Sequence, residues 1–580
     1  MISHTVINAP INQLSHELLL AIAACLPRNK LCILVTVCRS WNAALTPELY
    51  RLIYLKSQTH FELFFNTVIA LAPHKRLDHH VRQLRIKYYG TKSNVLHGTR
   101  LFPFVTEIAG NVFGNEALIP VMKQWKALRK ITTVYDVNAA KHFPTDVLRN
   151  QLITLSVNVS NVREWISLIP QLQNLEELCI IYDGYSLDKT DRSLSYSDLD
   201  NIHNNLLHLR KLCLERVALN GQLPDVIKPC NTMKELSLQP ISGDSCGYYF
   251  AKKYTQLQIL NVSCDTEDDD DPESAILPLI KSCRYLTYLF LSDDELYPTC
   301  FDILEDINAP LTELSYTGLY NISQFWKTLS SFHKTLTDIT ISDVQRIHFK
   351  EVITQLKLCP ALVDLYLRRF DHKVDLDWIL NELNGLKSLE LEANIISVQQ
   401  NHCTSIHRQL KTLVMQGSDV EDEVYLYLSK CCPRISYLSS YLDCPYSYRF
   451  SQRYSYQYRR SRMIYYPRPF LAQLNWSING RYLFKLTQVD KAVPFGWDNK
   501  IDNRTIEQLD AMECTKWLLS QDRTIKQLDA SEVENIIADL QSDDGDKRSQ
   551  WSDLDIISVI CYYAADLNLC NIPSDKFHYV

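Results

Sequence analysis

Residue types that could do chemistry are present in this chain, but their spacing does not predict an active site. His16 and Glu17 begin like the His-Glu-x-x-His motif of zinc proteases, yet no histidine follows three residues after Glu17. The 16 histidines are scattered without a regular acidic partner. The 14 glycines form neither a Gly-x-Gly-x-x-Gly nor a Gly-x-x-x-x-Gly-Lys loop for phosphate. We therefore predict a non-catalytic protein that uses no cofactor.

Metal binding is not predicted either. The 18 cysteines include no Cys-x-x-Cys pair and do not cluster with histidines at zinc-finger spacing. The acidic run from Asp268 to Asp271 lacks the glycine and the terminal glutamate of a calcium loop, which favours a solvated surface insertion. We expect no metal site in this chain.

The cellular compartment is predicted from what the first residues and the charge suggest. The sequence before Ser15 has no basic region followed by an apolar one, and no run of about 18 apolar residues occurs. The net charge is −7 and the pI is near 6.2, so no global basic field favours nucleic acid. We expect reduced thiols, a location in the cytoplasm and/or nucleus, no membrane partner and no nucleic acid partner.

A six-residue phrase, Leu-x-x-Leu-x-Leu, recurs along most of the chain. Most successive copies begin 23 to 26 residues apart, which is a sign of a repeat architecture. The twelve copies begin at Leu152, Leu175, Leu209, Met233, Leu257, Leu286, Leu311, Leu336, Leu362, Leu386, Leu410 and Ile435. Two weaker copies begin earlier, at Val81 and Leu128.

The phrase predicts a short strand followed by a helix in each copy. Its first, fourth and sixth residues point into a core, and the residues between them point outward. One such unit cannot bury its apolar face alone, so neighbouring units must stack. The pattern resembles the leucine-rich repeat. This resemblance implies an α/β solenoid, in which a curved parallel sheet is lined on its outside by helices.

Four cysteines occupy one fixed place, three residues before the strand anchor. A recurring position indicates a recurring structural environment, in which a free cysteine acts as a small buried apolar residue. The phrases KLCPALVDLYL and KCCPRISYL resemble the cysteine-containing subclass of leucine-rich repeats. The four residues are Cys230, Cys283, Cys359 and Cys432.

The segment from Ile11 to Leu52 predicts a small helical module that needs a partner. Leu14, Leu18 and Ile22 fall on one helical face, Pro27 ends that helix, and a second apolar run leads to Trp41. The order of these residues resembles an F-box, with Ser15 standing where the family usually has proline. By this resemblance the module docks on a Skp-type adaptor and, through it, on a cullin scaffold, with Trp41 as the main anchor. The implied adaptor-binding residues are Leu14, Glu17, Leu18, Leu19, Ile22, Leu26, Pro27, Leu31, Val37, Cys38 and Trp41.

A protein substrate is expected on the concave face of the repeats, where the residues between the leucines project. These residues are polar in the early repeats, at Glu177, Lys211 and Glu235. Later they become aromatic or basic, which interface hot spots favour. The alternative is that loops of the same chain cover the aromatic residues. The predicted substrate-binding residues are Tyr288, Phe290, Tyr366, Arg368 and Arg369.

After about residue 442 the repeat pattern stops. Tyrosines and arginines dominate 441–470, which can stack on single-stranded nucleic acid or form a loop or a packing peptide. Asn479-Gly480, between alternating apolar residues, predicts a hairpin that caps the sheet edge. A duplication beginning at Arg504 and Arg523, followed by the apolar stretch 554–569, predicts three amphipathic helices.

The predicted organisation has five parts. These are the F-box at 10–54, a bridging helix and degenerate first repeats at 55–150, regular repeats at 151–442, a Tyr/Arg-rich segment with the hairpin at 443–500, and a small helical tail at 501–580. The predicted function is substrate recognition in a Skp-cullin-F-box ubiquitin ligase, with transfer chemistry done by other subunits. The alternative is a leucine-rich-repeat interaction scaffold that recruits no ligase.

Overall fold

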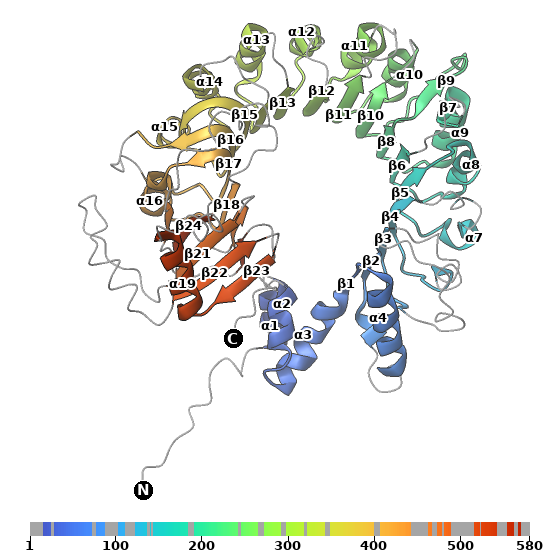
Figure 1. Ribbon diagram of the computed structural model, residues 1–580. Coiled ribbons are helices and arrows are strands. Elements are labelled where there is room, and N and C mark those ends of the chain that lie inside the picture. The colour runs from blue at the N-terminus through green and yellow to red at the C-terminus, as the bar shows by residue number, and fades with distance from the viewer. Residues whose placement is uncertain are drawn as a thin grey trace. The chain divides into compact units, whose positions relative to one another are not determined.

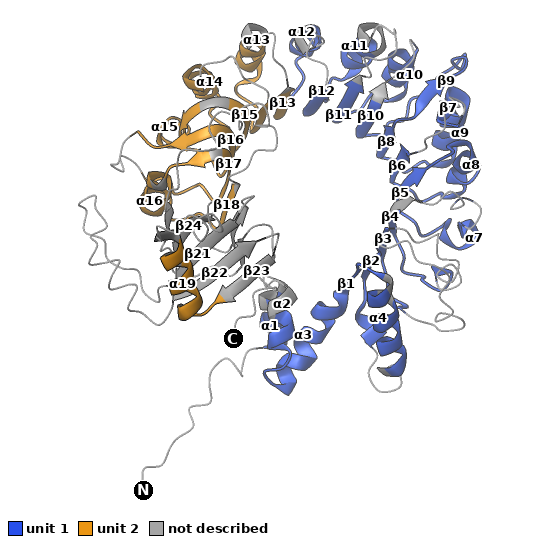
Figure 2. Ribbon diagram, in the orientation of Figure 1, with its two compact units in different colours: residues 1–310 blue, residues 311–580 orange. Residues whose placement is uncertain are grey.

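The protein is described from a computed structural model, in which the chain forms two compact units, residues 1–310 and residues 311–580 (Figure 2). The structure describes residues 15–24, 28–71, 77–86, 102–110, 122–135, 140, 143–183, 191–241, 245–264, 272–291, 297–317, 322–342, 349–399, 406–441, 462–466, 473–477, 481–488, 515–521, 524–541, 554–561 and 566–569.

Unit 1 begins with three helices and continues as a parallel sheet. The N-terminal helices are α1 (His16–Ala24), α2 (Arg28–Leu34) and α3 (Arg39–Arg51). The sheet strands, in spatial order, are β1 (Leu52–Leu55), β2 (Gln83–Ile86), β3 (Glu107–Gly110), β4 (Lys130–Tyr135), β5 (Thr154–Val159), β6 (Glu177–Tyr182), β8 (Lys211–Glu215), β10 (Glu235–Ile241), β11 (Ile259–Cys264) and β12 (Tyr288–Leu291).

The remaining helices of unit 1 lie along one side of these strands (Figure 1). A separate pair of short strands, β7 (Ser193–Ser195) and β9 (Ala218–Asn220), flanks α9. The helices are α4 (Gln58–Leu71), η2 (Leu77–His80), α7 (Thr145–Leu148), α8 (Arg163–Ile166), η4 (Ile169–Gln171), α9 (Tyr196–Asn205), α10 (Cys246–Lys253), α11 (Pro272–Ser282) and α12 (Tyr297–Asp306).

Unit 2 repeats the same strand-and-helix pattern. Its parallel sheet runs through β13 (Glu313–Thr317), β14 (Asp338–Ser342), β15 (Asp364–Asp375), β16 (Ser388–Ser397), β17 (Thr412–Val420), β18 (Tyr437–Tyr441), β20 (Gln473–Ser477) and β25 (Asp566–Leu569). Its helices α13 (Ile322–Phe332), α14 (Phe349–Leu356), α15 (Leu376–Glu382) and α16 (Asp422–Cys431) lie on one side of that sheet (Figure 1).

The predicted repeat is confirmed strand by strand. Each of the twelve predicted phrases coincides with a strand that begins two residues after the phrase does, and the two weaker phrases give β2 and β4. The fourth residues of successive phrases are register partners, as Leu178 is of Leu212 and Leu389 is of Leu413. These leucines are fully buried. The chain is therefore an α/β leucine-rich-repeat protein that carries a small all-α module at its N-terminal end.

The recurring cysteines lie where a small apolar residue is required. Cys283, Cys359 and Cys432 are buried, and Cys230 is half-buried. In three of the four copies the strand anchor donates its backbone N–H to the cysteine carbonyl, for example Leu362 to Cys359 at 3.2 Å. Burial raises the pKa of the Cys283 and Cys359 thiols to about 12, so these thiols stay protonated at neutral pH.

The last part of the chain differs from the prediction. Strands replace most of the predicted helices: β22 (Thr515–Gln521), β23 (Thr524–Leu528) and β24 (Leu554–Cys561) join β19 (Arg462–Tyr466) and β21 (Arg481–Gln488) in a mixed sheet. Within 501–580, α19 (Ala530–Gln541) is the one helix among the described residues. Among the described residues, the prediction holds for α19, which lies within the second predicted helix, and it is wrong for the strands. The apolar residues of β24 are mostly β-branched and suit a strand.

The predicted hairpin is also wrong, although both of its strands exist. β20 and β21 flank Asn479-Gly480 but do not pair with each other. β20 is instead a further parallel strand of the repeat sheet, beside β18. Its sequence from Leu471, Leu-x-x-Leu-x-Trp, follows the repeat phrase, and this long-range pairing prevails over the local turn signal.

A buried polar cluster joins α9 to α10. Ser195 begins α9 with a capping box, in which its hydroxyl accepts from the Asp198 N–H at 3.1 Å. The buried face of α9 carries His203, whose Nε2 lies 2.6 Å from the Tyr254 hydroxyl. Burial, aided by the positive charge of Lys253, lowers the pKa of His203 to about 3, so the imidazole is neutral in the folded protein.

Acidification is expected to destabilise unit 1 through His203. The imidazole has a pKa of 6.5 in the unfolded chain and about 3 in the folded protein. Its contribution to the free energy of unfolding is therefore complete above pH 6.5 and is lost as the pH falls toward 3. Between pH 7 and pH 5 the expected loss is about 2 kcal/mol. Urea denaturation at both pH values measures this loss. The His203→Gln variant should show a correspondingly smaller difference between the two pH values, and an unchanged difference would contradict this assignment.

Candidate functional site

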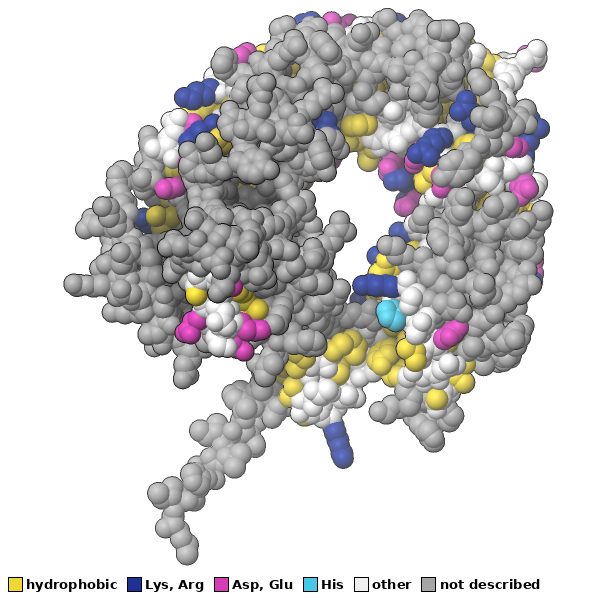
Figure 3. All heavy atoms as spheres, in the orientation of Figure 1, with side chains coloured by type: hydrophobic (Ala, Val, Ile, Leu, Met, Phe, Trp, Pro, Cys, Tyr) yellow, Lys and Arg dark blue, Asp and Glu magenta, His cyan; other side chains and the backbone are white. Residues whose placement is uncertain are grey.

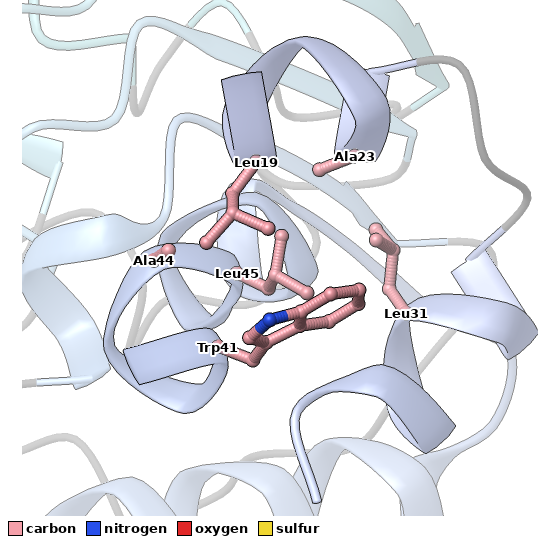
Figure 4. Close-up of a cluster of buried hydrophobic side chains, with 6 residues drawn as sticks. All are labelled: Leu19, Ala23, Leu31, Trp41, Ala44 and Leu45. Atoms are coloured by element: carbon pink, nitrogen blue, oxygen red, sulfur yellow. The ribbon is translucent and has the colours of Figure 1, made fainter. Parts of the chain in front are cut away.

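The three N-terminal helices enclose their own small core. α1 and α2 both pack against α3. Six buried residues form the centre, and Figure 4 shows the Trp41 indole lying among the aliphatic side chains. Leu34, Val35, Cys38 and Leu49 pack around its edge. The central residues are Leu19, Ala23, Leu31, Trp41, Ala44 and Leu45.

Local hydrogen bonds hold the ends of these helices. The Ser15 hydroxyl accepts from the Leu18 N–H at 3.4 Å and so caps α1, which explains how serine can stand in place of proline there. Backbone and side-chain hydrogen bonds at this helix start lower the pKa of the exposed Glu17 carboxyl. Between α2 and α3, the Asn42 side-chain amide donates to the Val35 carbonyl at 2.8 Å. The turn that presents Val37 is thereby fixed.

Apolar side chains remain exposed on a module whose core is already filled. Leu18 on α1 and Val37 before α3 are each 53% exposed, and Ile33 on α2 is 60% exposed. Figure 3 shows hydrophobic side chains gathered at the surface over these helices. Ile33 was not predicted as a site residue. The sequence feature that could have identified Ile33 is an apolar residue outside the Leu31–Leu34 face of its helix.

The predicted adaptor-binding residues divide by their burial. Glu17, Leu18 and Val37 are exposed, and Cys38 is half-buried. Leu19, Leu31 and Trp41 lie in the core, and Trp41 is only 5% exposed. Trp41 is therefore a core residue of the module, and its role as the main adaptor anchor stays a prediction. Ile22 lies in α1, and Leu14, Leu26 and Pro27 lie outside the described residues.

The module passes directly into the repeats. α3 ends at Arg51 and β1 begins at Leu52, with no residue between them. The Arg51 carbonyl accepts from the Arg82 N–H at 2.9 Å, and β1 pairs with β2 in register. A helix, α4, is present where the bridging helix was predicted, but it connects β1 to β2 within the repeat sheet and does not join the module to the repeats.

The predicted substrate-binding residues fall in both units. Tyr288 and Phe290 lie on β12 of unit 1 and are half-buried. Tyr366 and Arg368 lie on β15 of unit 2, where the Arg368 guanidinium pairs with the Glu390 carboxylate at 2.9 Å. Arg369 has a φ of 61°, which lies in the left-handed region. These side chains are at least partly accessible, so loops of the chain do not bury them completely.

An acidic row that the sequence analysis missed lies beside Tyr366. Glu313, Asp338 and Asp364 are register partners on β13, β14 and β15. Burial, followed by the negative charge of Asp338, raises the pKa of both Glu313 and Asp364. The sequence feature that could have revealed this acidic row is an acidic third residue in three successive repeat phrases. In the described part of the chain, no group of three or more His, Cys, Asp or Glu residues could hold a metal ion.

Comparison with known proteins identifies the N-terminal module. Residues 11–56 match the F-box-like family. The match covers α1, α2, α3 and β1, the part of the chain with the filled core and the exposed apolar side chains. Among solved structures, that of a TLR13–ssRNA13 complex is 13% identical with a TM-score of 0.32, over 63% of this chain and 49% of that chain. This likeness carries no inference, and the repeat architecture rests on the strand pairing described above.

Proposed function

We propose that this protein is the substrate-recognition subunit of a Skp-cullin-F-box ubiquitin ligase. The F-box-like match at residues 11–56 supports docking on a Skp-type adaptor. The observation that carries the proposal is the exposure of Leu18 and Val37 on a module that has already closed its own core. Apolar side chains left in water on a structured surface favour burial against a partner.

The repeats supply the other half of the proposal. A leucine-rich-repeat sheet presents a row of outward residues on rigid strands, a surface suited to a protein substrate. In unit 1 we assign Tyr288 and Phe290 to this contact, and in unit 2 Tyr366 and Arg368.

The cysteines before the strands support membership of the cysteine-containing repeat subclass. No described helix is long and apolar enough to cross a bilayer. The proposed location is the cytoplasm or nucleus.

The second candidate is a leucine-rich-repeat scaffold whose N-terminal helices only cap the sheet. The direct passage from α3 into β1 favours it, because the helices are then a continuous extension of the first strand of unit 1. In this case the protein still binds partners through the repeats, but a Skp-type adaptor does not bind the module.

Adaptor binding separates the two candidates. In a pull-down with a purified Skp-type adaptor, the wild-type chain should bind, and Leu18→Asp with Val37→Asp should weaken binding at least about tenfold. A charge placed in an apolar contact loses its hydration without gaining a partner. Both positions are exposed, so the helices should stay folded, which circular dichroism checks.

The matched control is Leu63→Asp on α4. Leu63 is 61% exposed and lies outside residues 11–56, so this variant carries the same change and should bind like the wild type. Failure of the wild type to bind any Skp-type adaptor would leave the scaffold as the function. Equal weakening by all three substitutions would show that the loss does not come from the F-box-like surface.

A further inference from the structure

Two cysteines lie side by side on neighbouring strands of unit 1. Cys179 is the fifth residue of the phrase that forms β6, and Cys213 is the fifth residue of the phrase that forms β8. The two strands are parallel, and the two residues are register partners. Adjacent strands lie about 4.8 Å apart, so the two side chains leave the same face of the sheet at that spacing. Leu178 and Leu212 point to the opposite, buried face.

The surroundings of the pair make its two thiols unequal. Cys179 and Cys213 are hydrogen-bonded to each other, with Ser156 of β5 beside Cys179 and Ser237 of β10 beside Cys213. The hydrogen bond from Cys179 is the main cause that lowers the pKa of Cys213, and Ser237 and Lys211 add to it. The same bond raises the pKa of Cys179. This inequality favours Cys213 as the attacking thiol of the pair.

The other free cysteines of the described chain lack this arrangement, and Cys431 forms a disulfide, contrary to the prediction that all thiols are reduced. Cys246, Cys283 and Cys359 are buried, and burial raises the pKa of each thiol. Cys230 is half-buried, with its sulfur 3.4 Å from the Thr232 hydroxyl. Among the described residues, Cys179 and Cys213 are the one pair of cysteines in register on adjacent strands. Both are half-buried, so a small oxidant can reach them.

We propose that Cys179 and Cys213 form a reversible dithiol–disulfide site that a peroxide oxidises. Disulfides join residues whose Cα atoms are about 4.4–6.8 Å apart, and the spacing of neighbouring strands falls inside that range. The site belongs to unit 1 alone and does not depend on adaptor docking.

The reaction has two balanced steps. The Cys213 thiolate attacks one oxygen of hydrogen peroxide, the O–O bond breaks, and the sulfur becomes a sulfenic acid while the other oxygen leaves as water after taking up a proton. The Cys179 sulfur then attacks the Cys213 sulfur, and the S–O bond breaks as a second water leaves. Two thiols lose two electrons in total, and one peroxide becomes two waters. A dithiol such as dithiothreitol supplies the two electrons that reverse the reaction.

The experiment uses the reduced full-length chain. The protein is treated with a small excess of hydrogen peroxide, its remaining thiols are alkylated, and a non-reducing digest is analysed by mass spectrometry. A cross-linked peptide containing Cys179 and Cys213 should become the main oxidised product, and dithiothreitol should remove it. Cys213→Ser should abolish this product and leave Cys179 alkylated, whereas Cys179→Ser should trap sulfenic or sulfinic acid on Cys213. These single replacements keep the shape of the side chain, and circular dichroism checks the fold.

Cys230→Ser is the matched control, because Cys230 is also half-buried but has no cysteine partner in register. The cross-link should form as in the wild type. Ser237→Ala removes a hydrogen bond that lowers the pKa of Cys213 and should slow cross-linking several-fold at pH 7. The proposal is overturned if Cys179 and Cys213 stay fully alkylated under peroxide that oxidises the exposed Cys32. It is equally overturned if Cys179→Ser leaves Cys213 unoxidised.

Discussion

Trp41→Ala should unfold the N-terminal helices and abolish adaptor binding without removing any surface contact. The indole is 5% exposed and lies at the centre of the six-residue core, so its removal leaves a large cavity. A buried tryptophan replaced by alanine costs about 3–5 kcal/mol, more than a module of some forty residues can be expected to spare. Hydrogen exchange measures the effect directly, because amides within α1 and α3 should lose protection while those of β6 to β12 keep theirs.

Comparison with the surface variants distinguishes loss of the helical fold from loss of a surface contact. Trp41→Ala and Leu18→Asp with Val37→Asp should all reduce adaptor binding, but only Trp41→Ala should reduce amide protection. Leu45→Ala, another fully buried core replacement, should act like Trp41→Ala. Unchanged protection in Trp41→Ala would show that the module does not depend on this core, and the structural role assigned to Trp41 would then be wrong.

Asp200→Ala is expected to cost unit 1 about 3–5 kcal/mol. The Asp200 Oδ1 atom accepts from the Lys253 Nζ at 2.6 Å and from the Tyr249 hydroxyl at 2.7 Å. The Lys253 side chain is 2% exposed, so the loss of Asp200 leaves an ammonium group buried without its counter-charge. Urea denaturation followed by circular dichroism measures the loss of stability.

A double replacement distinguishes a lost ion pair from lost packing. Asp200→Leu with Lys253→Met removes both charges and keeps apolar volume, and buried ion pairs replaced in this way lose little stability or gain some. The double variant should therefore recover most of what Asp200→Ala loses. If the double variant is as unstable as Asp200→Ala, the pair is not what joins α9 to α10. An exposed pair, Lys357 with Glu382 at 2.6 Å, serves as the control and should cost less than about 1 kcal/mol.

The strands could be predicted from sequence because one phrase fixes both their position and their inward face. The same phrase did not predict β3, because one residue of β3 departs from it. β3 follows a Val-x-x-Ile-x-Gly phrase, with Gly110 where leucine was expected. Gly110 has a φ of +100°, and a Cβ atom there would collide with the Ile86 carbonyl, so packing against β2 required the exception. The strand therefore lies halfway between the two weak phrases, where no complete phrase was visible.

Burial within the candidate site could not be predicted, because a helical pattern shows which residues are apolar and not what covers them. Leu18 and Leu19 are adjacent and chemically identical, yet one is exposed and the other lies in the core. The strand pairing of the C-terminal part depends on long-range contacts, as the separation of β20 from β21 shows. The Cys179–Cys213 pair required the register of two strands whose phrases begin 34 residues apart in sequence.

Because α3 continues directly into β1, the length of α3 determines how the N-terminal helices are oriented relative to the sheet of unit 1. An α-helix turns by about 100° and advances about 1.5 Å with each residue. One residue added near the end of α3 would thus swing Leu18 and Val37 about a quarter turn around the helix axis relative to β1. Nothing flexible separates Arg51 from Leu52 to absorb that rotation. The number of residues in α3 therefore sets the direction in which a docked partner would extend from unit 1.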